Sequence, residues 1–243
     1  MRTMAGMALR IGMVLAMGWV VAMGCDAAAQ DAIITDRPGF STGPGTVARG
    51  RTQLEAGFER AQGGAVTAPF ALLRYGVGAR TEVRASWSGL TFDDGGADGL
   101  GGAVEVKRTL GAGARGSTGL LASVAIPSGG GALDPSLGFL WSTSVGEVGV
   151  FGTATVGAPS AGGERRLTGT NSVGASLSLT DALGVFAEHF VSVAEGPGAE
   201  VQYLDGGVTY LVGPNLQLDL NAGISVGGAD AGDFVGGGIA YRF

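Results

Sequence analysis

Polar and apolar residues alternate with a period of two along most of this chain, and this alternation limits the possible folds more than any other feature. In residues 215–226, for example, Leu216 and Leu218 alternate with Gln217 and Asp219. Side chains of a β-strand point alternately to its two faces, so each such segment has one apolar face and one polar face. The chain is therefore predicted to be all-β.

Twelve segments carry the pattern, and most of the turns between them contain glycine or aspartate. The predicted strands are residues 51–60, 68–77, 81–91, 99–109, 117–126, 135–146, 148–157, 168–179, 184–193, 200–211, 214–226 and 232–243. A tilted strand of about 9–11 residues crosses a membrane, and bacterial outer-membrane barrels have even strand numbers. The expected fold is a transmembrane antiparallel up-and-down β-barrel of about 12 strands. The alternative is a soluble sandwich, in which the leucines pack inward against a second sheet.

Composition and connection lengths fit a closed barrel. Glycine supplies 48 of 243 residues without a three-residue period, and charged residues make up 15% with a net charge of −6. Glycines let neighbouring strands of a closed sheet approach closely, and an acidic chain repels nucleic acid, so no nucleic-acid partner is expected. Longer connections follow the odd-numbered strands, which places the short turns at the periplasmic rim of such a barrel.

Residues 1–30 have the layout of a secretory signal peptide. Arg2 and Arg10 precede an apolar run over residues 11–23, and small residues follow at 27–29. The run is shorter than the roughly 20 residues that a membrane-spanning helix needs. Cys25, the single cysteine, is either lipidated or removed with the signal. The predicted organisation is a signal peptide (1–30), an irregular lead-in (31–50) and an outer-membrane barrel (51–243).

Several short motifs add a family resemblance. They are Thr35–Phe40, Gly50–Glu59, Leu73–Gly76 with Glu82–Arg84, Phe186–Glu188, Gly206–Tyr210 and Asn215–Asp219. Together they resemble the outer-membrane proteins of the MetA-pathway of phenol degradation family, whose members are often labelled transporters. The resemblance implies a transport function and a loose link to aromatic compounds. The terminal Phe243 resembles the aromatic end by which the barrel-assembly machinery recognises such proteins, so that machinery is an expected partner.

Charges gather on the polar strand faces, where an inward orientation would line a bore. The predicted lumen-lining residues are Glu55, Glu59, Arg74, Glu82, Arg84, Glu105, Lys107, Glu188, Asp205, Gln217, Asp219 and Arg242. A charge on the lipid side costs about 2–4 kcal/mol for Arg or Lys near the midplane, which favours this orientation. Two interpretations stay open: a constriction that selects solutes by charge, or a structural ion-pair network.

The lead-in is a candidate plug. Asp36 and Arg37, stiffened by Pro38, are able to fold back into the periplasmic mouth and pair with charges of the lumen. The alternative is a flexible tether.

Enzymatic and metal chemistry are not expected. His189, the single histidine, and Ser192 are three residues apart on a predicted strand and therefore point to opposite faces. No catalytic residues, metal site or cofactor are predicted. Asp93, Asp94 and Asp98 offer either a calcium site in an external loop or ordinary turn chemistry.

The chain is thus predicted to be a porin-like channel of the bacterial outer membrane that takes up small molecules passively, hydrophobic or aromatic ones among them. Its expected partners are outer-membrane lipid and small-molecule solutes. The alternative function is a non-conducting barrel that acts as a structural or surface-interaction protein.

Overall fold

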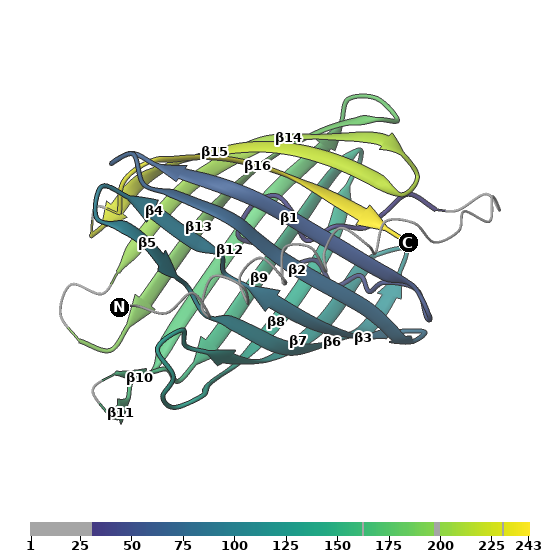
Figure 1. The fold of residues 1–243 in the computed structure, drawn as a ribbon. Coiled ribbons are helices and arrows are strands. Elements are labelled where there is room, and N and C mark those ends of the chain that lie inside the picture. The colour runs from purple at the N-terminus through teal and green to yellow at the C-terminus, as the bar shows by residue number, and fades with distance from the viewer. Residues whose placement is uncertain (1–30, 162, 197–199, 230) are drawn as a thin grey trace. The chain divides into compact units, whose positions relative to one another are not determined.

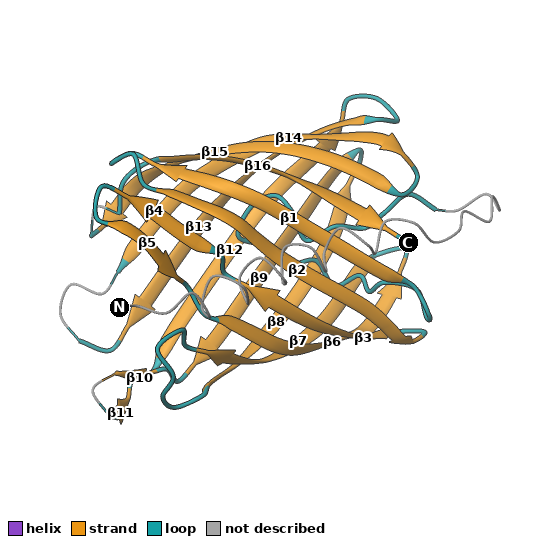
Figure 2. Cartoon of the chain, viewed as in Figure 1, coloured by secondary structure: helices purple, strands orange, loops and turns teal. Residues whose placement is uncertain are grey.

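The computed structural model describes residues 31–161, 163–196, 200–229 and 231–243. The predicted signal peptide, with Cys25, lies outside the described residues. Residues 32–242 form one compact unit, a sheet of antiparallel strands that curls into a closed barrel (Figures 1 and 2). Among the described residues there is no helix of the length and apolarity that a membrane span requires.

Twelve strands form the wall of the barrel. In chain order they are β1 (Thr52–Ala61), β2 (Val66–Gly78), β3 (Thr81–Trp87), β6 (Gly102–Gly113), β7 (Gly116–Ile126), β8 (Asp134–Val145), β9 (Val148–Gly157), β12 (Thr168–Ser178), β13 (Leu183–Ala194), β14 (Val201–Gly213), β15 (Leu216–Gly228) and β16 (Phe234–Arg242). Each pairs with its neighbours in chain order, and β1 pairs with both β2 and β16. This last pairing closes the sheet and confirms the predicted up-and-down barrel.

Two additional hairpins were not predicted. β4 (Leu90–Asp93) pairs with β5 (Gly96–Gly99) and with the start of β2, so the segment predicted as one strand over 81–91 is divided after Trp87. The backbone at Gly89 has a φ of 95°, which lets the chain turn between the two parts. A short hairpin of β10 (Ser160–Ala161) and β11 (Glu164–Arg165) lies in the connection between β9 and β12.

The barrel buries polar residues and exposes apolar ones. Its buried polar set includes Arg74 and Lys107, both 0% exposed, whereas Leu220 is 60% exposed. In water this arrangement is unfavourable, but in a bilayer the apolar outer face contacts acyl chains while the interior keeps the charges away from lipid. Leu218 and Ile224 are exposed like Leu220, so the leucines form no dry core and the sandwich alternative is wrong.

The two rims differ in their connections. One rim carries the short turns that follow β2, β6, β8, β12 and β14, and we call it the short-turn rim. The opposite rim carries the longer connections, including both additional hairpins. The longer connections therefore follow the first, third, fifth, seventh, ninth and eleventh strands of the wall, as predicted.

Candidate functional site

The lead-in, residues 31–50, runs through the interior of the barrel. Ile33 donates its backbone N–H to the carbonyl of Pro214 at 2.8 Å, and Gly50 donates to the carbonyl of Gly76 at 2.8 Å. Pro214 lies in the turn after β14, and Gly76 lies near the end of β2, so the lead-in enters and leaves at the short-turn rim. Between these two points its side chains contact wall strands on several sides.

Asp36 connects the lead-in to three cations of the wall. Its Oδ2 lies 2.8 Å from Lys107 Nζ, 3.1 Å from Arg84 Nη1 and 3.4 Å from Arg74 Nη1. The Asp36 side chain is only 3% exposed. Its second oxygen, Oδ1, accepts a hydrogen bond from the backbone N–H of Gly43 at 3.1 Å, which also ties the two arms of the lead-in together.

The charge of Asp36 is strongly stabilised. Burial by itself raises the pKa of its carboxyl, but Arg74, Lys107 and Arg84 together lower that pKa well below its ordinary value. Asp36 is therefore ionised at any physiological pH and forms a permanent anionic anchor among the three cations.

Arg37 fastens the lead-in to the neighbouring side of the wall. Its Nη2 lies 2.8 Å from Asp219 Oδ1 on β15, and its guanidinium carbon lies 4.9 Å from the centre of the Phe70 ring. Two glycines of the wall make room for it: a Cβ at Gly57 would lie 2.7 Å from Arg37 Cζ, and one at Gly238 2.5 Å from Nη2. An alanine at either position would collide with the guanidinium and with a backbone carbonyl of the neighbouring strand.

The wall cations also pair with carboxylates of the wall. Arg74 lies 2.7 Å from Glu55 and 2.9 Å from Glu82, and all three side chains are fully buried. Lys107 lies 3.3 Å from Glu82. In the same region Arg84 lies 2.8 Å from Glu105. The charged network thus extends over β1, β2, β3 and β6 and includes Asp36 of the lead-in.

The turn of the lead-in, residues 39–43, reaches the far side of the bore. We call it the tip. Glu188 of β13 accepts hydrogen bonds from the backbone N–H groups of Phe40 and Ser41, and from Ser41 Oγ at 2.5 Å. Ser41 Oγ is also 2.7 Å from Ser172 Oγ on β12, and Thr42 donates its N–H to Thr153 Oγ1 on β9 at 2.9 Å.

An aromatic cluster holds the tip as well. The Phe40 ring stacks on Phe190 with centroids 4.2 Å apart and lies 5.5 Å from Tyr203. Phe234 meets Phe40 edge-on at 5.8 Å. Gly39 precedes Phe40 with a φ of 97°, a conformation that favours glycine. A Cβ at Gly39 would also collide with the Glu188 carboxylate.

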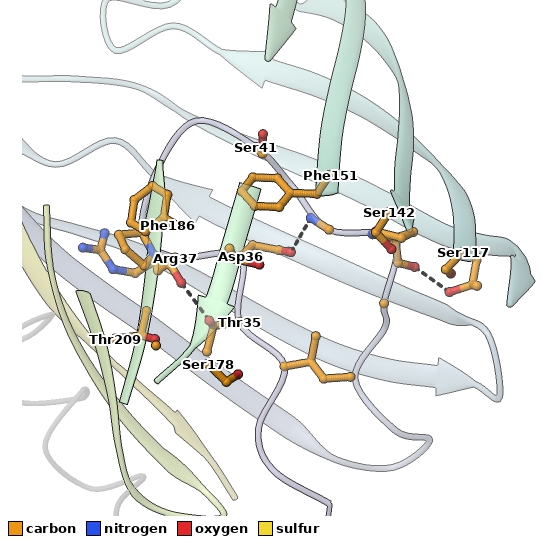
Figure 3. A pocket seen from close by; sticks show the side chains of 18 of the residues that line it. Thr35, Asp36, Arg37, Ser41, Ser117, Ser142, Phe151, Ser178, Phe186 and Thr209 are labelled. Carbon is orange, nitrogen blue, oxygen red and sulfur yellow. Dashed lines mark hydrogen bonds between the residues drawn. The ribbon is translucent and has the colours of Figure 1, made fainter. Parts of the chain in front are cut away.

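A cavity of about 770 Å³ lies beside the lead-in. Its floor includes Thr35, Asp36 and Ser41 of the lead-in, and its wall residues belong to β6, β7, β8, β9, β12, β13 and β14, with Ala79 and Arg80 from the first short turn. In Figure 3, Thr35 and Asp36 lie between Ser117 and Ser142 on one side and Thr209 on the other. The cavity is therefore adjacent to the short-turn rim.

The structure places most of the predicted lumen-lining residues in the interior. Buried there are Gln217 and the charged residues Glu55, Arg74, Glu82, Arg84, Lys107, Glu188, Asp205 and Asp219. Glu105 is nearly so, with a side chain 13% exposed. Gln217 donates to Thr35 Oγ1 and to the carbonyl of Arg37. Asp205 lies opposite Glu188 in the register, and both carboxyl groups are buried.

Glu59 and Arg242 are half-buried. Arg242 donates to Asn215 Oδ1 at 2.9 Å in the turn after β14, so it lies at the short-turn rim. Pro38 follows Arg37 in the lead-in, and Phe243 directly follows β16.

Two other groups of residues named from the sequence lie away from the bore. His189 is exposed on the opposite strand face from Glu188, and its ring is 3.1 Å from Gln202 Oε1. Asp93 ends β4 and accepts a hydrogen bond from the N–H of Gly95, which is ordinary turn chemistry.

Sequence reasoning missed the tip and the serine and threonine side chains of the cavity. Phe40 was the available signal, because a large aromatic residue in an irregular segment between Pro38 and Pro44 needs an apolar partner. The serines and threonines gave no signal, since hydroxyl residues are common on any polar strand face.

A closed antiparallel sheet of twelve strands, apolar outside and charged inside, defines a porin-like barrel of the outer membrane. The sequence profile of the family described as "Putative MetA-pathway of phenol degradation" matches residues 35–243. The chain belongs to this family, which confirms the resemblance seen in its motifs.

Solved structures of outer-membrane channels have the same fold. The KdgM porin is similar with a TM-score of 0.59 at 10% identity, over 79% of this chain and 99% of that one. The NanC porin gives 0.58 at 8% identity, over 79% and 100%. The COG4313 outer membrane channel from Pseudomonas putida F1 gives 0.58 at 11% identity, over 90% and 100%. A comparison with curated proteins found no match.

Proposed function

We propose that this protein is a passive channel of the bacterial outer membrane for small molecules, hydrophobic or aromatic ones among them, and that the lead-in is its internal plug. The observation that carries the proposal is the path of the lead-in through the bore. Asp36 pairs with β2, β3 and β6, Arg37 with β15, and the tip with β9, β12 and β13. A segment fastened on so many sides obstructs the passage between the two rims.

The proposed transport involves no chemical change of the solute. The family membership and the likeness to porins support conduction, whereas the ion pairs of the lead-in support closure. An internal segment of this kind sets the open probability of a channel, because conduction requires the segment to move or to leave a side passage.

Deletion of residues 31–48 tests the plug. The purified barrel is reconstituted in planar bilayers, and its single-channel conductance is compared with that of the intact protein. We expect a larger and more persistent conductance after the deletion, because the wall cations keep carboxylate partners of their own. Heat-modifiable gel migration verifies that the shortened chain still forms a barrel. An unchanged conductance in a folded barrel would remove the plug from the proposal.

The contacts of the lead-in also favour a second candidate, a non-conducting barrel that serves as a structural or surface-interaction protein. The same pair of proteins distinguishes the two functions. If the intact protein gives no conductance and no solute flux, and the deletion variant conducts, the lead-in is a permanent stopper and the intact protein is the scaffold.

A further inference from the structure

The inner wall of the barrel is divided into a charged part and an uncharged part. The charged network and Asp219 lie on the adjacent strands β15, β1, β2, β3 and β6. On the inner faces of β7, β8, β9 and β12, between their ends, the registers place only uncharged residues. They are Ser117, Gly119, Leu121, Ser123, Ser136, Gly138, Leu140, Ser142, Phe151, Thr153, Thr155, Thr170, Ser172, Gly174 and Ser176.

The lead-in and the cavity share the bore unequally. The ion pairs of Asp36 and Arg37 hold the lead-in against the charged strands. Most charges of the wall there are therefore paired with the lead-in or with one another. The cavity lies on the other side: its wall residues come from β6 to β14, and β1, β15 and β16 contribute none. Of the charged side chains that line it, Asp36 and Arg37 are both engaged in ion pairs, and Arg80 lies in the turn at the rim.

The uncharged side offers hydroxyl groups for hydrogen bonding. Ser142, Ser176, Ser178 and Thr209 line the cavity, and their hydroxyls have no hydrogen-bond partner within the described part of the chain. Such groups are available to a solute or to water.

Two phenylalanines of the cavity pack over glycines of neighbouring strands. A Cβ at Gly174 would lie 2.6 Å from the Phe151 ring, and a Cβ at Gly207 would lie 2.8 Å from the Phe186 ring. The glycines therefore let both rings lie close to the wall, which leaves more of the bore to the cavity. A flat apolar solute surface finds partners in these rings, and its polar groups find the hydroxyls.

The tip is the part of the lead-in that bounds the cavity on this side. Ser41 lines the cavity, and the tip is held by Glu188, Ser172, Thr153 and the ring cluster around Phe40. Moving the tip breaks these contacts, and Gly43 also loses its hydrogen bonds with Asp36 Oδ1 and Lys107 Nζ, whereas the ion pairs of Asp36 and Arg37 remain. Gly39 and Gly43 stand at its two ends and supply backbone freedom.

We propose that uncharged, hydrogen-bonding solutes pass along the β7–β14 side of the bore in preference to anions, and that displacement of residues 39–43 opens this route while Asp36 and Arg37 stay anchored. The proposal rests on the channel function proposed above. Beyond Arg80 at the rim, an anion in the cavity loses hydration and meets no free cation, because Arg37 is paired with Asp219, and the buried carboxylates Glu188 and Asp205 repel it. A neutral solute exchanges its water for the hydroxyl groups of the wall at little cost.

Liposome swelling with two solutes of nearly equal size tests the selectivity. The probes are arabinose and its anion arabinonate. We expect the intact protein to admit arabinose at least about tenfold faster than arabinonate. Equal or faster entry of arabinonate overturns the inference, while the channel function stands. If no solute enters through the intact protein, the channel function itself fails and the inference fails with it.

A matched pair of variants on β12 tests the route. Ser176 faces the cavity, and the adjacent Ala175 is exposed on the opposite strand face. Ser176→Phe should slow arabinose entry several-fold, whereas Ala175→Phe should not. Ser142→Phe on β8 repeats the test on a second strand, in case one variant fails to form a heat-modifiable barrel. Unchanged entry in the folded cavity variants, or equal slowing in Ala175→Phe, overturns the route.

A reversible tether tests the movement of the tip. Ser41 Oγ and Ser172 Oγ are 2.7 Å apart, so cysteines at both positions are placed to form a disulfide between the tip and β12. Oxidation should abolish arabinose entry and reduction should restore it, with the single variant Ser172→Cys insensitive to both treatments. Unaltered entry through the oxidised, verified disulfide overturns the displacement of the tip.

Discussion

Replacement of Asp36 by Asn removes the anchoring charge of the lead-in and keeps its shape. The amide oxygen of Asn is still able to accept the hydrogen bond from Gly43, so the change isolates the three contacts with Lys107, Arg84 and Arg74. Loss of one member of a buried ion pair costs about 3–5 kcal/mol, because the remaining charge is left without a partner.

The structure places Asp36→Asn at the lower end of this range. Each of the three cations keeps a carboxylate of the wall: Arg74 keeps Glu82, Arg84 keeps Glu105, and Lys107 keeps Glu82 at 3.3 Å. We therefore expect a loss of about 3 kcal/mol in the free energy that holds the lead-in, which corresponds to a roughly 150-fold shift toward the displaced state.

Single-channel recording measures this shift as the probability of an open state in which the whole lead-in, and not the tip alone, is displaced. The matched control is Asp98→Asn on β5, an exposed position remote from the lead-in. The Asp36 variant should open far more often than the control at the same voltage and salt, with normal heat-modifiable migration. If both folded variants open as rarely as the intact protein, the ion pairs do not hold the plug and the reasoning is refuted.

Three further predictions follow from the same contacts. The pKa of Asp36 lies below its ordinary value of 3.8, so the stability that its charge gives to the plugged state is complete above that value and is lost only as pH falls through the lower pKa. The difference in opening free energy between Asp36→Asn and the intact protein should therefore be constant from about pH 8 to about pH 5. A decline within that window contradicts the assignment. Phe40→Ala should raise the open probability, because the stacking contacts alone contribute about 0.5–1.5 kcal/mol beyond area burial; Phe92→Ala in the β4–β5 hairpin is the control, and equal gating of the two variants argues against the aromatic contacts. Leu220→Arg should lower the free energy of unfolding from lipid vesicles by about 2–4 kcal/mol in a urea titration, whereas Leu220→Met should not; equal stability would mean that this face does not meet lipid.

The alternation of side chains made the barrel wall predictable from the sequence. Strand number and the direction of each residue follow from a local period of two, strand order follows from the short connections of an up-and-down barrel, and the cost of charge in lipid decides which face is outside. The exceptions occur where the period does not decide. Residues 90–93 alternate like a continuation of β3, but they pair with β5 and β2 after the turn at Gly89.

The sequence also identified Asp36 and Arg37 as side chains that could pair with charges of the lumen, but it did not give their partners. Arg37 and Asp219 are 182 positions apart, and their contact depends on the closure of β1 against β16 and on two glycines that leave room for the guanidinium. An irregular segment has no period from which such a contact can be inferred.

What the sequence determined alone is the wall: twelve amphipathic strands, apolar outward, because each residue's face is set by its immediate neighbours in the chain. The tertiary structure decided what fills the bore. Only the closed sheet brings β15, β1, β2, β3 and β6 together as one charged side, and only the path of residues 32–50 leaves the cavity on the other. Those outcomes depend on long-range packing, which no local pattern of residues records.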